Sequence, residues 1–185
     1  MISPEQQRAD VLSRLSQAGN LLEESMDPRL AAGAPANIGY AIRGARDHTG
    51  VASIPGGLVI RDTKVRAAGP SGFGTDEAIA RVVLSAMKFD PEMRCAATIR
   101  YAPRIQGVLE DMFLECCTVD RARQAPGVST MDWGIASCCK DGVPEAVIDP
   151  GTAPQKAAIH LFGETPGDVA GNIIMLSNRI IRIEL

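Results

Sequence analysis

Segments typical of strands and of amphipathic helices alternate irregularly along this chain, and that irregularity limits the folds open to it. Apolar, strand-like segments fall at 37–43, 50–56, 58–62, 64–69, 95–101, 115–120, 145–151 and 156–163. Helical periodicity falls at 3–24, 75–89, 103–113, 129–142 and 165–179. Strict alternation would indicate a doubly wound parallel sheet, whereas a run of early strands without intervening helices indicates a mixed one. The sequence therefore predicts a three-layer α/β/α fold around a mixed β-sheet.

Local signals set several boundaries. The dipeptide Asp62-Thr63 between two strand-like segments predicts a hairpin turn. Capping boxes predict three helix starts, with Ser3 and Gln6, Ser129 and Asp132, and Thr165 and Asp168 as the paired residues. The tail at 180–185 fits either a continuation of the last helix or an edge strand. A turn-rich stretch at 26–36 divides the chain into an N-terminal helix with its linker, 1–29, and a domain of 30–185.

Composition and charge exclude several classes of function. The basic residues are spread along a chain of net charge −3, and aromatic residues make up 4% of it, so we expect no nucleic-acid partner. No apolar run approaches the length of a membrane span. The N-terminus also lacks the basic start and apolar stretch of a secretory signal. We therefore expect a cytoplasmic protein with no membrane partner.

The cysteines and histidines limit the metal and redox chemistry. Five cysteines occur, at positions 95, 116, 117, 138 and 139, and they include no CxxC motif. Because adjacent cysteines rarely bond to each other and nothing indicates secretion, we expect reduced and mostly buried thiols. His48 and His160 are the two histidines of the sequence, so a three-histidine metal site is excluded by count. A Mg²⁺ ion held by carboxylates stays open.

The stretch AAGPSGFGTDEAIARVV, residues 67–83, places glycines directly before an expected helix. A helix N-terminus attracts anions, and glycines let the backbone approach a phosphate. On this interpretation Gly72, Phe73, Gly74 and Thr75 bind a phosphate. The stretch lacks the spacing of a P-loop or of GxGxxG, and the acidic residues that begin the helix compete for its dipole. The local pattern alone therefore favours a plain turn over an anion site.

Charged residues stand at the ends of two other expected strands. Asp120 and Arg121 end one of them, while Arg94 precedes and Arg100 ends another. Strand ends in α/β sheets open onto ligand crevices, and converging arginines suit a phosphorylated ligand. Surface ion pairs are the competing interpretation.

The stretch IDPGTAPQK, residues 148–156, follows a strand with a loop rich in proline and glycine. Asp149 suits Mg²⁺ or a ligand hydroxyl, or it caps the turn. Lys156 and His160 come next, and a lone histidine in an apolar strand is either structural or a general acid or base. We take Asp149, Lys156 and His160 as candidate catalytic residues. The chain contains no GxSxG and no Cys–His signature, which argues against a nucleophilic hydrolase.

Taken together, several stretches resemble the archaeal-type thiamine-phosphate synthase domain, the ThiN family. They are NIGYAIRGARDHTGVASIPGGLV, GPSGFGTDEAIARVVLSAMKFDPEMRCAATIRY, VDRARQAPG, MDWGI and PEAVIDPG, within roughly residues 30–175. The resemblance implies a fold similar to class II aldolases, without their metal site. It also implies that hydroxymethylpyrimidine diphosphate and hydroxyethylthiazole phosphate are joined to thiamine phosphate, with release of pyrophosphate. Both substrates carry phosphate, which gives the glycine stretch and the arginines at 94, 100 and 121 a purpose.

The chain departs from the family's pattern at two places. Where the family tends to read Asp-Arg-Gly-Gly-x-Gly-Lys-Glu-Pro-Met-Ile-Arg, residues 149–160 read DPGTAPQKAAIH, so that Pro150 replaces Arg, Gln155 replaces Lys and Lys156 replaces Glu. Where the family tends to have Asn before Ile-Arg, this chain has Thr98. Cations aimed at the leaving group stabilise a departing diphosphate, so these losses bear on catalysis.

Two functions are therefore open. The first is a divergent thiamine-phosphate synthase, in which Asp149 positions Mg²⁺ or the pyrimidine. The second is a catalytically inactive ligand-binding or sensor domain of thiamine metabolism. In both cases the expected partner is a phosphorylated small molecule. The N-terminal helix has one apolar face, which could cover its own domain or a second copy in a homodimer.

Overall fold

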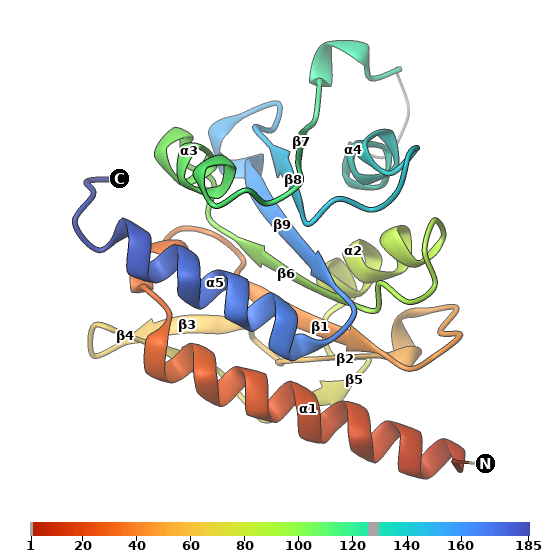
Figure 1. Cartoon of the computed structure of the whole chain (residues 1–185). Coiled ribbons are helices and arrows are strands. Elements are labelled where there is room, and N and C mark those ends of the chain that lie inside the picture. The colour runs from red at the N-terminus through yellow and green to blue at the C-terminus, as the bar shows by residue number, and fades with distance from the viewer. Residues whose placement is uncertain (1, 126–129) are drawn as a thin grey trace.

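The computed structural model describes residues 2–125 and 130–185, which form three layers (Figure 1). The middle layer is a seven-stranded sheet in the order β5-β2-β1-β6-β9-β8-β7. Its strands are β1 (Asn37–Ala41), β2 (Val51–Ser53), β5 (Gly72–Phe73), β6 (Cys95–Ile99), β7 (Cys116–Thr118), β8 (Ala146–Asp149) and β9 (Ala158–Gly163). The β7–β8 pair is parallel and the other pairs of this sheet are antiparallel. The predicted mixed sheet is confirmed.

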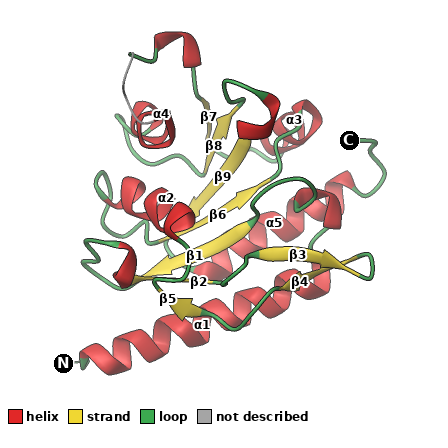
Figure 2. Cartoon of the chain, turned by 180° about the vertical axis from the view of Figure 1, so that it is seen from behind, coloured by secondary structure: helices red, strands yellow, loops and turns green. Residues whose placement is uncertain are grey.

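Helices cover both faces of the sheet, which confirms the α/β/α layering (Figure 2). On one face lie α1 (Pro4–Ser25), α3 (Pro103–Asp111) and α5 (Pro166–Ile180), and on the other lie α2 (Glu77–Met87) and α4 (Thr130–Cys138). Side chains alternate along a strand, so each strand contributes to two cores. In β6, Ala97 and Ile99 pack under α1 and α5, whereas Ala96 packs under α2.

The N-terminal helix is part of the folded domain. Its capping box forms as predicted, with the Ser3 side chain accepting from the Gln6 backbone and the Gln6 side chain accepting from the Ser3 backbone. Its apolar face, which includes Leu15 and Leu22, is fully buried against the sheet and α5. Of the two alternatives for this helix, the structure shows the first, packing on its own domain. None of the helices in residues 2–125 and 130–185 combines the length and apolar character of a membrane span.

A separate hairpin of β3 (Leu58–Arg61) and β4 (Lys64–Ala67) packs beside α1. Asp62 and Thr63 both have positive φ, 50° and 63°, which two-residue hairpin turns of this kind require. The predicted hairpin is confirmed at these two residues.

One helix boundary differs from the expectations, one predicted cap lies outside the described residues, and the C-terminal tail has two alternatives to decide between. The helix expected at 129–142 ends earlier, at Cys138, and its predicted cap Ser129 is not among the described residues. Asp132 contacts Arg81 of α2, with 3.1 Å between Oδ2 and Nη2. The last helix ends at Ile180 and a turn follows, so the tail is not an edge strand.

The expectation that all five cysteines are free thiols is wrong, because Cys117 and Cys138 form a disulfide with 5.7 Å between their Cα atoms. Alternation along β7 explains the choice: Cys116 packs on the α1 face, which leaves Cys117 on the face of α4. Cys138, the last residue of α4, reaches β7, whereas Cys139 just after the helix is buried in the core. Burial raises the pKa of Cys116 and of Cys139 to about 11, which disfavours the thiolate form of both.

Candidate functional site

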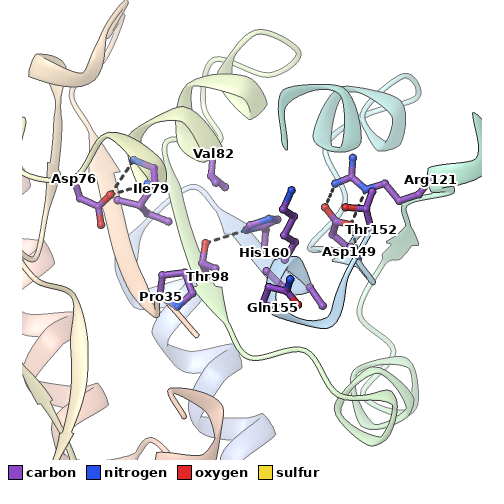
Figure 3. Close-up of a pocket in the computed structure, with 15 residues that line it drawn as sticks. Pro35, Asp76, Ile79, Val82, Thr98, Arg121, Asp149, Thr152, Gln155 and His160 are labelled. Carbon is purple, nitrogen blue, oxygen red and sulfur yellow. Dashed lines mark hydrogen bonds and ion pairs between the residues drawn. The ribbon is translucent and has the colours of Figure 1, made fainter. Parts of the chain in front are cut away.

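A pocket of about 270 Å³ opens at one end of the sheet strands, on the face that α2 covers (Figure 3). On this side of the sheet β6, β7 and β8 end, while β1 and β9 begin. Ile79 and Val82 of α2 form an apolar wall, and Pro35 adds to it. Thr98 and His160 form the floor, and the loop at 151–158 closes the opposite side. Proteins with α/β folds commonly bind ligands in crevices just outside the ends of the strands.

The floor of the pocket is a buried hydrogen-bonded pair. Thr98 and His160 stand directly opposite each other on β6 and β9, and 2.9 Å separates Thr98 Oγ1 from His160 Nδ1. The two residues are 7% and 5% exposed. Burial lowers the pKa of His160 to about 4, although Asp149 opposes the change; Arg121 adds to it. At neutral pH the imidazole is therefore uncharged.

An ion pair closes one end of the pocket. Arg121, which follows β7, donates from Nε to Asp149 Oδ1 at 3.0 Å and from Nη2 to Oδ2. It also donates to Gln124, and Asp149 accepts from the backbone of Gly151 at 2.9 Å. Helix α4 covers the guanidinium so closely that a Cβ at Gly134 would lie 3.2 Å from Nη2. The charges of Arg121 and Asp149 thus largely offset each other.

The opposite end of the pocket is the first turn of α2. Asp76 is the N-cap, and its Oδ1 accepts from the backbones of Ala78 and Ile79 at 2.9 and 3.2 Å. Its Oδ2 accepts from Asn37 Nδ2 at 2.7 Å. The carboxylate therefore occupies the positive end of this helix, where an anion would otherwise bind.

The four residues predicted to bind phosphate, Gly72, Phe73, Gly74 and Thr75, do not line this pocket. Gly72 and Phe73 form the short edge strand β5, and Gly74 turns with φ of 67°. The Thr75 hydroxyl lies 2.8 Å from the Ser53 hydroxyl. The structure thus accounts for these residues as an edge strand and a turn, and phosphate binding by them stays a prediction.

The two arginines that flank β6 lie at opposite ends of this strand. Arg94 donates to Tyr40 Oη at 2.7 Å and to the Ala41 carbonyl at 2.9 Å, and its guanidinium lies over the Tyr40 ring. Arg100 lies at the pocket end, half-buried in a neighbouring hollow that shares Ala157 with the pocket. Among the described residues, the Arg100 side chain has no hydrogen-bond or ion-pair partner. Arg100 can therefore serve a ligand at the mouth of the pocket, whereas Arg94 supports the strand beside it.

The two remaining candidates are exposed. Asp120 pairs with Arg123 at 3.2 Å and caps the short turn that carries Arg121. Lys156 lies on the rim of the pocket, in the loop that Gly151 turns with φ of 71°. A Cβ at Gly151 would come within 2.7 Å of the backbone of Ala157, so this loop needs glycine there.

The comparisons with known proteins agree with this architecture. Residues 14–175 match the family described as thiamine-phosphate synthase ThiN. The chain belongs to the ThiN family. It is 31% identical over 166 residues to the bifunctional thiamine biosynthesis protein ThiDN of Methanocaldococcus jannaschii. That alignment covers 88% of this chain and 39% of the relative, so the chain spans well under half of the relative's length.

Solved structures bear out the fold of this ThiN domain. The crystal structure of the C-terminal domain of protein MJ0236 superposes with a TM-score of 0.87 and 28% identity, over 100% of both chains. An L-fuculose 1-phosphate aldolase from Glaciozyma antarctica gives a TM-score of 0.53 at 13% identity, over 98% of this chain and 76% of that one. The second likeness concerns the fold alone, and with it the predicted similarity to class II aldolases is confirmed.

Of the candidate residues, the structure gathers Asp149, Lys156, His160 and Arg121 around the pocket of this ThiN domain, with Arg100 beside its mouth. Residue-by-residue interpretation of the sequence missed two polar groups, Asp76 as a pocket residue and Asn37 as its partner. Thr98 was noted only as a departure from the family's pattern. A polar residue inside the apolar segment CAATIRY was the available signal for Thr98.

The two carboxylates of the pocket are already engaged by other groups of the protein. In the parts of the chain that the structure describes, no group of three or more histidine, cysteine or acidic residues could hold a metal ion. Asp149 is paired with Arg121, and Asp76 is bound to Asn37 and to the start of α2. Mg²⁺ typically takes one or two protein carboxylates together with phosphate oxygens of a substrate. A Mg²⁺ site made by the protein alone therefore does not fit these residues.

Proposed function

We propose that this chain binds thiamine-related phosphates in the pocket and joins hydroxymethylpyrimidine diphosphate to hydroxyethylthiazole phosphate. The products are thiamine phosphate and pyrophosphate. Membership of the ThiN family supports the reaction class. The observation that carries the proposal is the gathering of Asp149, His160, Arg121 and Lys156 around one pocket. All four are candidate site residues predicted from the sequence.

The reaction sets clear demands on such a site. The bond between the methylene carbon of the pyrimidine and the bridging diphosphate oxygen breaks, and pyrophosphate leaves with the electron pair. The thiazole nitrogen supplies the electron pair of the new carbon–nitrogen bond. The protein must therefore hold two rings in line and stabilise negative charge on the leaving group. In this proposal, Lys156 on the rim and Arg100 beside the mouth bind the phosphates.

One observation favours the second function, a ligand-binding or sensor domain without catalysis. Arg121, the cation inside the pocket, is already paired with Asp149, and His160 carries no charge at neutral pH. Few cations are thus directed at a leaving diphosphate from within the pocket. In the catalytic proposal, Mg²⁺ enters as a counter-ion carried by the diphosphate itself.

One experiment separates the two functions. Purified protein is incubated with both substrates and Mg²⁺, and thiamine phosphate and pyrophosphate are measured. Formation of both products establishes the synthase. If no product forms but thiamine phosphate raises the melting temperature, the protein is a ligand-binding or sensor domain and not a synthase. If neither substrate nor thiamine phosphate raises the melting temperature, and no product forms, both functions are wrong.

Arg100 provides a test of the phosphate position. Replacement of a charged hydrogen-bond donor costs about 1.5–3 kcal/mol, so Arg100→Ala should weaken binding of thiamine phosphate by about 10- to 150-fold. Arg104→Ala, on the exposed start of α3, is the matched control and should bind as the wild type does. Isothermal titration measures both variants. Unchanged affinity in Arg100→Ala would remove Arg100 from the site.

A further inference from the structure

We propose that Thr98 and His160 recognise the heteroaromatic ring of the ligand, and that its phosphates lie outside them, toward Lys156 and Arg100. Thr98 acts as a positioning residue, because it acts through His160. The inference rests on the proposed function for the identity of the ring. It goes further by assigning the two halves of the ligand to different parts of the pocket.

The pair is built to hold one orientation of an imidazole. The registers of β6 and β9 place Thr98 and His160 opposite each other, and the 2.9 Å contact with Nδ1 fixes the ring at the floor of the pocket (Figure 3). His160 Nε2 has no hydrogen-bond partner among the described residues, although the side chain lines the pocket. A ligand that reaches the floor therefore meets Nε2.

The charges around the floor suit a neutral ring better than a phosphate. His160 is uncharged at neutral pH, since burial lowers its pKa to about 4. The charged groups that share its pocket are Asp149 and Arg121, which are paired, Asp76 at the far end and Lys156 on the rim. Two carboxylates and one buried guanidinium leave the interior without excess positive charge, and burial of an uncompensated phosphate there would be costly.

A neutral imidazole matches the edge of a nitrogen heterocycle. Depending on the role that Nδ1 takes toward Thr98, Nε2 either donates its proton or accepts with its lone pair. Ring nitrogens and exocyclic amino groups, as in an aminopyrimidine, can complement either arrangement. Because the hydroxyl of Thr98 can donate or accept, the contact with Nδ1 persists in either tautomer, and Nε2 stays directed at the ligand.

The walls and the size of the pocket fit the same half of the ligand. Ile79 and Val82 are 2% and 1% exposed, and they present apolar surface to the pocket together with Pro35. Such surfaces suit the faces of a flat ring. The volume of about 270 Å³ lies just below the usual range for drug-sized ligands, which is in keeping with one substituted ring.

The outward half of the pocket has the opposite character. Lys156 is exposed on the rim, and Arg100 lies half-buried in the hollow next to it. Neither side chain has a partner among the described residues, so both can bind phosphate oxygens without breaking an existing contact. The pocket therefore runs from a neutral, apolar floor to a basic mouth.

Isothermal titration with two partial ligands tests the division. The probes are hydroxymethylpyrimidine without phosphate and inorganic pyrophosphate, and the variants are Thr98→Val, Thr98→Ser and His160→Asn. Thr98→Val keeps the shape but removes the hydroxyl, so binding of hydroxymethylpyrimidine should weaken about 5- to 10-fold. Binding of pyrophosphate should stay within about twofold. Thr98→Ser restores the hydroxyl and should bind both probes as the wild type does.

His160→Asn keeps a group near the position of Nδ1 but lacks Nε2, so it should lose binding of hydroxymethylpyrimidine and retain that of pyrophosphate. The melting temperature of each variant shows that it is folded. Equal losses for both probes, no loss for either, or a Thr98→Ser variant as weak as Thr98→Val would overturn the inference. Wild-type protein that binds neither hydroxymethylpyrimidine nor thiamine phosphate would instead refute the proposed function, and this inference with it.

Discussion

Acid should destabilise this protein in part through His160. Its pKa falls from about 6.5 in the unfolded chain to about 4 in the folded protein, because burial disfavours the charged form. Between these two pKa values the histidine is protonated in the unfolded chain but not in the folded protein. The free energy of unfolding therefore falls as the pH drops from 6.5 toward 4. At 1.36 kcal/mol for each pH unit, the loss at pH 4.5 amounts to about 2–3 kcal/mol.

Urea unfolding at pH 7.5 and at pH 4.5, followed by circular dichroism, measures this loss in the wild type and in His160→Asn. Asparagine does not titrate, so the variant should lose about 2–3 kcal/mol less than the wild type over the same interval. Carboxylates titrate in both proteins and largely cancel in the comparison. His48→Gln is the matched control, and it should keep the wild-type dependence because His160 is still present. Equal pH dependence in the wild type and His160→Asn would refute the reasoning.

Three further perturbations test the packing of the fold. Cys138→Ser should lower the free energy of unfolding by about 3 kcal/mol, since the bond to Cys117 closes a separation of 21 residues. Dithiothreitol should lower the free energy of unfolding of the wild type by the same amount and leave that of the variant unchanged. Alkylation of five thiols in the unreduced wild type would contradict the disulfide. Gly57→Ala should lower the free energy of unfolding more than Gly44→Ala does. Both have positive φ, but a Cβ at Gly57 would meet a carbonyl oxygen at 2.5 Å, whereas the space at Gly44 is open. The left-handed backbone alone costs about 1–2 kcal/mol, and equal losses in urea unfolding would argue against the close approach. Leu15→Ala should cost about 2–5 kcal/mol, and a loss below about 1 kcal/mol would show that α1 is dispensable to the core.

Local patterns predicted the parts of the fold that depend on neighbours in sequence. The capping box at Thr165 and Asp168 forms as expected, because its contacts lie within one turn of helix. The hairpin at Asp62-Thr63 follows from the same locality. The clustering of early strands predicted a mixed sheet, since it leaves no helix for parallel crossovers between them.

Features that depend on pairing across the sheet were not readable from the sequence. The Thr98–His160 contact requires the register of β6 on β9. The disulfide requires knowing that β7 turns Cys117 toward α4, which the sequence separation does not reveal. In each case a strand order joins residues that are distant along the chain.

The sheet ends in very short strands on both sides. The outermost strands, β5 and β7, have two and three residues, and the disulfide further anchors β7 to α4. Exposed strand edges are templates on which another chain can extend a sheet, and short edges offer little to pair with. Two copies of this ThiN domain that associate as a homodimer should therefore meet through helices or loops. The same brevity should also protect the chain from aggregating edge to edge.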